Sequence, residues 1–314
     1  MNTGEGLIYK STGSWYMLRD TEGRTWQARV RGKLKIDTEI ASSNPIAVGD
    51  VVYYDIEDEA ANTAIIKNVA KRRNYIIRVS PQNRNQKHIV AANLDAALII
   101  ATLAEPRTSN GFIDRFLVTA EAYHIPVIIV VNKLDLHNEK HSAQLAEWRS
   151  QYEAAGYELF AISALRPESI AALQDRIAGC TTLFSGHSGV GKSTLINALK
   201  PDLALRTMEV SEWSGKGQHT TTFAEMFDLP EASGGGRIID TPGVKEFGLI
   251  DMEREELSHY FPEMRRILND CRFNNCMHMD EPGCAVKAAV TAGTITVDRY
   301  ASYLTILESI EKKW

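Results

Sequence analysis

The fold of this chain is decided by one short stretch, Gly186-His187-Ser188-Gly189-Val190-Gly191-Lys192-Ser193. It has the spacing G-x-x-x-x-G-K-S and lies between an apolar run, 182–184, and a helical stretch that begins at Thr194. In such a strand–loop–helix unit, backbone N–H groups close around phosphate oxygens at the positive end of the helix. The stretch therefore predicts a phosphate-binding loop, in which Lys192 extends to the outer phosphates and the Ser193 hydroxyl faces Mg²⁺.

A second motif, Asp240-Thr241-Pro242-Gly243, follows the strand-like run 237–239. On its own such a tetrapeptide is usually a turn. Downstream of a phosphate loop, however, an aspartate in this place holds Mg²⁺, often through water, while the glycine N–H contacts the γ-phosphate. We therefore predict that Asp240 is a magnesium ligand and that Gly243 binds the nucleotide.

A third motif, Asn132-Lys133-Leu134-Asp135, follows the apolar run 127–131, at the end of a predicted parallel strand where such sheets bind ligands. Asp135 can accept hydrogen bonds from N1 and the 2-amino group of guanine. Adenine would leave this carboxylate buried and unpaired, so the site would bind adenine nucleotides much more weakly than guanine nucleotides. The pair Ser163-Ala164, after the strand-like run 159–162, can supply a backbone N–H to guanine O6, although Ser-Ala alone is a weak signal.

The order of these motifs is unusual, because the guanine-reading residues precede the phosphate loop. We interpret the order as a circular permutation, which a domain tolerates when its ends lie close together. The segment after Gly243 then leads directly into the C-terminal part, so we expect nucleotide state to reposition residues 251–314.

The residue after the DxxG motif is Val244, which cannot orient water as the glutamine of Ras-type enzymes does. The run 217–222 offers a substitute. His219 is the candidate catalytic residue, and Thr220 and Thr221 are candidate nucleotide or magnesium contacts. The alternative is an ordinary exposed loop histidine.

Residues 1 to about 70 consist of short alternating segments separated by glycines, which predicts a five-stranded barrel of the OB type. The net charge of −5 is unlike that of a general nucleic-acid binder, but positive charges gather locally at 24–35 and 71–88. Trp15, Tyr16 and Trp26 lie among them and could stack on RNA bases. A solvated basic surface on an inert docking module explains the same pattern.

Near the C-terminus, one short segment contains Cys271, Cys276, His278 and Cys284. Three cysteines and a histidine suit tetrahedral zinc with no position left for substrate, which predicts a structural zinc site. A group of buried thiols with an incidental histidine is the alternative.

Strand-length apolar runs alternate with amphipathic stretches from about 94 to 249, as in a parallel α/β sheet. We therefore predict an OB-fold RNA-binding domain at 1–72, a permuted GTPase domain at 73–250 and a mainly helical zinc domain at 251–314. No apolar run approaches the roughly 20 residues that cross a bilayer, and the N-terminus lacks a secretory signal, so we expect a cytoplasmic protein without membrane contact.

The permuted order, the run 217–222 and the spacing C-x4-C-x-H-x5-C beside Glu281-Pro282-Gly283 resemble the ribosome small-subunit-dependent GTPase A (RsgA) family over essentially the whole chain. The segment 86–95 also looks like that family's entry into the GTPase domain. The resemblance implies GTP hydrolysis stimulated by the small ribosomal subunit and its rRNA, a role in late subunit maturation, and catalysis by His219. Other small-subunit assembly factors are possible partners, and we expect a monomer.

Two other function classes stay open at this stage. One is a nucleotide-gated RNA-binding assembly module in which hydrolysis is incidental. The other is an ATPase or small-molecule kinase with a phosphate loop, against which Asp135 argues.

Overall fold

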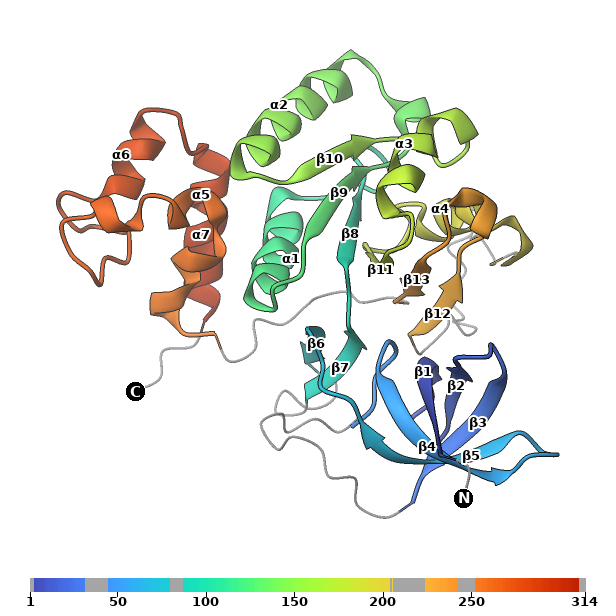
Figure 1. Cartoon of the computed structure of the whole chain (residues 1–314). Coiled ribbons are helices and arrows are strands. Elements are labelled where there is room, and N and C mark those ends of the chain that lie inside the picture. Colours follow the sequence, from blue (N-terminus) through green and yellow to red (C-terminus); the bar gives the residue numbers. More distant parts are fainter. Residues whose placement is uncertain are drawn as a thin grey trace, which may run out of the picture.

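The computed structural model describes residues 3–31, 45–79, 87–203, 205, 224–241 and 252–310. These residues form an N-terminal barrel, a central sheet covered by helices, and a C-terminal helical module, in that order along the chain (Figure 1). The predicted fold class, a permuted α/β GTPase domain between an OB-like barrel and a helical Cys-rich module, is confirmed. None of the described helices is both long and apolar enough to cross a membrane.

The N-terminal barrel closes because β1 pairs with both β2 and β4, while β3 and β5 pair in parallel on the far side. Alternate side chains point inward, and Leu18, Trp26 and Tyr54 form the centre of its core. The strands are β1 (Thr3–Ser11), β2 (Tyr16–Asp20), β3 (Thr25–Val30), β4 (Val51–Asp58) and β5 (Thr63–Val69).

A two-stranded hairpin, β6 (Tyr75–Val79) and β7 (Lys87–Ala92), follows the barrel. The basic run 71–88 gave no indication of it. A buried ion pair between Arg72 and Asp50 (2.6 Å) ties the start of this segment to the barrel. The hairpin therefore continues from the barrel without a free linker.

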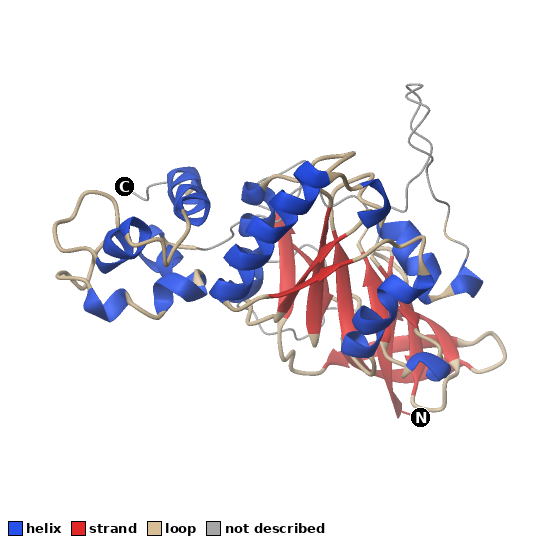
Figure 2. Cartoon of the chain, turned by 90° about the horizontal axis from the view of Figure 1, so that it is seen from above, coloured by secondary structure: helices blue, strands red, loops and turns tan. Residues whose placement is uncertain are grey.

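The central sheet has the order β10-β9-β8-β11-β13-β12, in which β12 is antiparallel to β13 and every other neighbour is parallel. Its helices cover both faces (Figure 2). Helices α1 and α2 pack on one face, through Phe116 and Trp148, and α3 and α4 pack on the other, through Leu173 and Ile196. The central strands β8 and β9 are wholly apolar, as expected when both faces are buried.

The elements of this central part are β8 (Ala96–Ala101), α1 (Asn110–Ala122), β9 (Val127–Val131), η1 (Leu134–Leu136), α2 (Glu139–Ala155), β10 (Glu158–Ala161), α3 (Pro167–Ile177), β11 (Thr181–Ser185), α4 (Lys192–Leu199), η2 (Pro201–Leu203), β12 (Glu225–Asp228), η3 (Glu231–Ser233) and β13 (Arg237–Asp240). Strand β12 also pairs with β1 of the barrel, where Lys10 lies opposite Glu225. Barrel and central part thus share one eleven-stranded sheet.

The C-terminal module packs against α1 through a buried polar contact. The Arg299 guanidinium donates to Asp114 of α1 (2.6 Å) and to Glu263 (2.7 Å) within the module. Burial alone lowers the pKa of Arg299, but the two carboxylates raise it, so the side chain stays charged. The module contains η4 (Arg254–Tyr260), α5 (Pro262–Arg265), η5 (Leu268–Asp270), α6 (Ala285–Thr291) and α7 (Val297–Ser309).

Candidate functional site

The predicted nucleotide-binding residues follow the carboxyl ends of neighbouring parallel strands. Asn132 follows β9, Ser163 lies just beyond β10, the phosphate loop follows β11, and Asp240 ends β13. Because these strands are parallel, their carboxyl ends meet at one edge of the sheet, where α/β proteins bind ligands. Residues that lie far apart in the permuted sequence are thereby brought to one place.

The phosphate loop turns sharply between β11 and α4. Gly191 has φ of +87°, and a Cβ there would come within 2.4 Å of the Asn132 amide. A Cβ on Gly186 would come within 2.7 Å of the Ile100 carbonyl oxygen. Only glycine fits these positions. Helix α4 begins at Lys192, so its first backbone N–H groups, up to Thr194, point toward the loop and can receive an anion.

Lys192 and Asp240 face each other across this loop. Their side chains form an ion pair, and both are largely buried. The neighbouring Thr241 hydroxyl donates to the Phe184 carbonyl (2.9 Å), which fixes the end of β13 against β11. The carboxylate predicted to bind a cation and the ammonium group predicted to bind phosphate therefore meet at the start of α4, beside Ser193.

The residues predicted to read guanine form a connected network. The Asn132 amide donates to the Val190 carbonyl (2.9 Å) and accepts from the Ala164 N–H (3.0 Å). The Ser163 hydroxyl donates to one carboxylate oxygen of Asp135 (2.5 Å). Asn132 thus holds the phosphate loop and the Ser-Ala turn together, and Ser163 orients Asp135.

Sequence reasoning missed the loop 102–109, which follows β8 at the same edge. The Thr108 hydroxyl lies 2.6 Å from Nε2 of His187, the second residue of the phosphate loop. The Lys133 ammonium donates to the Glu105 carbonyl (2.5 Å). This loop therefore contacts both the predicted phosphate loop and the predicted guanine-reading segment. Its position after a predicted strand was the only available signal.

Several predicted residues lie outside the described part of the chain. They are His219, Thr220, Thr221 and Gly243, together with the connection from Gly243 to the C-terminal module. The strand that follows the first three residues, β12, and the aspartate that precedes Gly243 are both described at the site edge.

The four predicted metal ligands come together in the C-terminal module. The sulfur atoms of Cys271, Cys276 and Cys284 and a ring nitrogen of His278 all lie within 4.8 Å of one another. Nδ1 of His278 is 3.3 Å from the Cys284 sulfur. Tetrahedral zinc with Zn–S bonds of about 2.3 Å needs ligand separations of about 3.7 Å, so the cluster fits zinc after small adjustments.

The electrostatics of this cluster also suit a cation. Burial lowers the pKa of His278, which leaves a neutral imidazole able to bind metal. Burial raises the pKa of the Cys276 thiol to about 12. Backbone N–H groups of Ala285 and Lys287 point at the sulfurs of Cys271 and Cys284, both at 3.4 Å. A zinc ion would supply the positive charge that three closely spaced thiolates require.

Several of the basic N-terminal residues form ion pairs with acids, so fewer of their charges are available to RNA than the sequence suggests. Arg24 and Arg29 pair with Glu59 and Glu57, and Arg72 and Arg73 pair with Asp50 and Asp95. The prediction that Tyr16 and Trp26 stack on bases is wrong, because both side chains are buried in the barrel core.

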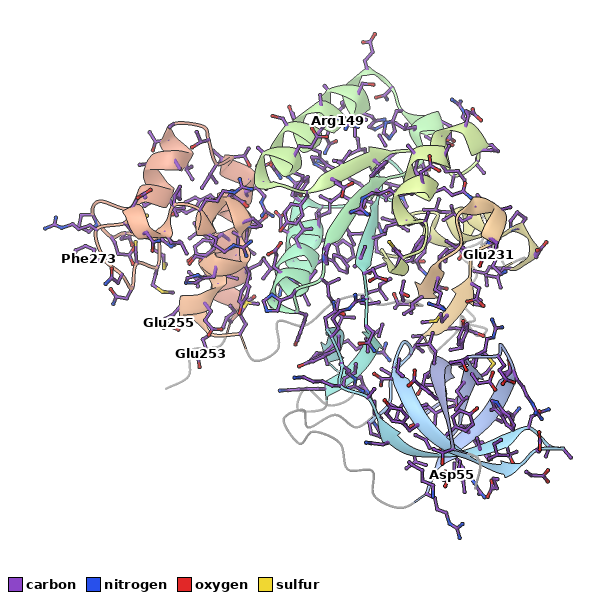
Figure 3. The ribbon with its side chains drawn as sticks, viewed as in Figure 1. Asp55, Arg149, Glu231, Glu253, Glu255 and Phe273 are labelled. Atoms are coloured by element: carbon purple, nitrogen blue, oxygen red, sulfur yellow. The ribbon has the colours of Figure 1, made fainter. Side chains whose placement is uncertain are left out.

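Two exposed aromatic side chains carry an arginine beside them. Trp15 is 46% exposed, and the Arg29 guanidinium lies 5.9 Å from its ring centre. Phe273, at the outer end of the C-terminal module away from the central sheet (Figure 3), lies 5.4 Å from the guanidinium of Arg272. Flat rings beside cations are the surfaces on which unpaired bases stack.

Comparison with known proteins adds to this geometry. The family model described as RsgA GTPase matches residues 69–250, and that described as RsgA N-terminal domain matches residues 5–66. A protein of Christiangramia forsetii named small ribosomal subunit biogenesis GTPase RsgA is 47% identical over 311 residues, covering 99% of this chain and 98% of that protein. A Bacteroides fragilis protein of the same name is 48% identical over 308 residues, covering 98% and 97%.

Solved structures agree in fold along the whole chain. YjeQ from Thermotoga maritima superposes with a TM-score of 0.77 at 31% identity, covering 98% of both chains. The structure of YloQ, described as a circularly permuted GTPase, superposes with a TM-score of 0.73 at 28% identity, covering 100% of this chain and 98% of that one. The chain therefore belongs to the RsgA GTPase family.

Proposed function

We propose that this protein hydrolyses GTP to GDP and phosphate during late maturation of the small (30S) ribosomal subunit, and that the subunit and its rRNA stimulate hydrolysis. The observation that carries the proposal is the meeting of the Asp135–Ser163 pair with the phosphate loop at one sheet edge. The relatives named for small-subunit biogenesis, which match nearly the whole chain, support the ribosomal role.

In this proposal the residues divide into four roles. Asp135, oriented by Ser163, selects guanine beside the Ala164 turn that Asn132 holds, and the phosphate loop with Lys192 binds the phosphates. Ser193 and Asp240 would hold Mg²⁺, which supplies positive charge to the phosphate oxygens, with Thr220 or Thr221 nearby. His219 positions the attacking water in place of the absent glutamine.

The surroundings of the protein follow from the same role. We propose that the three predicted units, 1–72, 73–250 and 251–314, act together on the subunit, and that the protein is a cytoplasmic monomer. The exposed ring–arginine pairs at Trp15 and Phe273 support rRNA contact at both ends of the molecule.

The experiment that tests this function measures GTP turnover with and without small ribosomal subunits, together with co-sedimentation in GDP and in a non-hydrolysable GTP analogue at several salt concentrations. We expect subunits to raise turnover strongly, and rising salt to weaken binding, because contacts to phosphates depend on salt. Failure to bind subunits in either nucleotide state would overturn the ribosomal role. Binding without stimulation would leave the assembly-module alternative.

His219→Ala is expected to lower stimulated turnover by about 10²-fold or more, since correct placement of an attacking group by a side chain contributes on that scale. GDP affinity should stay within about twofold of the wild type, because the predicted role is in hydrolysis only. The same turnover assay, with a GDP titration, measures both. His124→Ala, at the loop after α1, is the matched control and should change neither quantity.

We also propose that the Cys271–Cys276–His278–Cys284 cluster holds one structural zinc ion. Cys284→Ser is expected to release the zinc and unfold the C-terminal module, since structural zinc contributes folding energy directly. Native mass spectrometry gives the zinc content, and hydrogen exchange gives the protection of α6 and α7. Cys180→Ser, outside the cluster, should keep the metal. A folded module without zinc would contradict the proposal.

A further inference from the structure

Three strands place charged residues in one row between the barrel and the nucleotide site. Lys10 on β1 lies opposite Glu225 on β12, and Glu225 lies opposite Asp240 on β13. The Lys10 ammonium is 2.8 Å from a carboxylate oxygen of Glu225. At the far end of the row, Asp240 pairs with Lys192 of the phosphate loop. The row therefore reads positive, negative, negative, positive.

The strand pairing puts the two carboxylates beside each other. Residues directly opposite in an antiparallel pair project from the same face, with Cβ atoms about 5 Å apart. Packing identifies this face. Phe227 lies two residues after Glu225 and Ile238 two residues before Asp240, so each shares a face with its neighbour, and the two are opposite each other. Ile238 belongs to the core beneath α3 and α4. Glu225 thus lies on the face that carries Lys192, next to the proposed magnesium ligand.

An unneutralised Glu225 would change the site. A second negative charge at this distance would attract a divalent cation, compete for Lys192 and repel the nucleotide phosphates. The partner that neutralises it comes from the barrel. As a stabilising contact the pair is weak, because its side chains are 36% and 21% exposed. Its position beside the site therefore matters more than its strength.

We propose that Lys10 is a positioning residue of the magnesium–phosphate site, acting through Glu225. By neutralising Glu225 it leaves Asp240 as the carboxylate available to the cation and keeps Lys192 available to phosphate. The barrel thereby sets how strongly Mg²⁺ and nucleotide depend on each other. This inference rests on the proposed assignment of Asp240 to Mg²⁺.

The test measures the dissociation constant of a fluorescent GDP analogue in EDTA and in saturating Mg²⁺. The dissociation constant in EDTA divided by that in Mg²⁺ reports the coupling between cation and nucleotide, and its measurement involves no turnover. In Lys10→Gln we expect this ratio to rise about threefold to tenfold, because an exposed unpaired charge near a divalent ion acts at this scale. Binding should weaken mainly in EDTA, where no cation offsets the repulsion.

The double variant Lys10→Gln/Glu225→Gln should return the ratio to within about twofold of the wild type, because the unpaired charge is gone. A general loosening of the barrel would not be reversed in this way. The matched control is Lys67→Gln, which breaks a similar barrel pair with Asp55 (3.0 Å) away from the site and should leave the ratio unchanged.

Three outcomes would count against the inference. An unchanged ratio in Lys10→Gln, or a raised ratio that the double variant does not restore, would overturn the role of Lys10 while leaving the nucleotide site intact. A wild-type protein that binds GDP equally with and without Mg²⁺ would overturn the assignment of Asp240, and with it this inference.

Discussion

Asp135→Asn is expected to lower GTP affinity on the order of 10³-fold and to create affinity for xanthosine triphosphate. The Ser163 hydroxyl donates to one oxygen of Asp135, and the same bond would hold the asparagine oxygen there. The asparagine NH₂ would then face the N1–H and the 2-amino group of guanine. Because all three groups are hydrogen-bond donors, none of them would find an acceptor. Xanthine carries a carbonyl where guanine carries the 2-amino group, so it can accept from this NH₂.

Competition binding with GTP, ATP and xanthosine triphosphate measures the exchange of specificity. Gain of xanthine binding is the internal control, because a misfolded protein would bind none of the three. Retained preference for GTP over xanthosine triphosphate in Asp135→Asn would show that another group reads the base.

Arg299→Leu is expected to destabilise the contact between α1 and the C-terminal module by about 3–5 kcal/mol. The side chain of Asp114 is fully buried and that of Glu263 is 8% exposed, and removal of one member of a buried ion pair leaves an uncompensated charge. Burial already raises the pKa of Asp114, against the opposing effect of the Arg299 charge. Hydrogen exchange of α1 and α7 measures the free energy of local opening.

The matched control is Arg265→Leu. Arg265 also joins the module to α1, through Glu121 at 3.0 Å, but its side chain is 50% exposed. A surface pair of this kind contributes about 0–1 kcal/mol, so the control should differ little from the wild type. Equal effects of the two substitutions would contradict the role of burial.

The meeting of the three motifs at one sheet edge could be predicted because each motif directly follows a strand. The apolar runs before Asn132, Gly186 and Asp240 predicted parallel strands, and parallel strands bring their carboxyl ends to one edge. The loop after β8 lies at the same edge, but it contributes a backbone carbonyl, at Glu105, and an isolated hydroxyl, at Thr108. Such contacts depend on three-dimensional proximity and have no sequence signature.

The charge on the barrel surface was harder to predict, because a run of basic residues in the sequence does not show which distant acids pair with it. Arg72 and Arg73 meet acids that lie 22 residues away, and no local count reveals them. The burial of Trp26, in contrast, was available from the sequence. Thr25, Trp26, Gln27 and Ala28 alternate along a strand, and this period places Trp26 on the same face as Ala28.

The pairing of β1 with β12 has a consequence for how the protein can be cut. In the described part of the chain, β12 is the last strand of the central sheet, and β1 pairs with its outer edge where Lys10 lies opposite Glu225. A fragment that starts after the barrel would expose the backbone N–H and C=O groups of β12, and open strand edges favour association with other chains. A fragment that keeps the outer edge of β12 paired therefore includes the barrel.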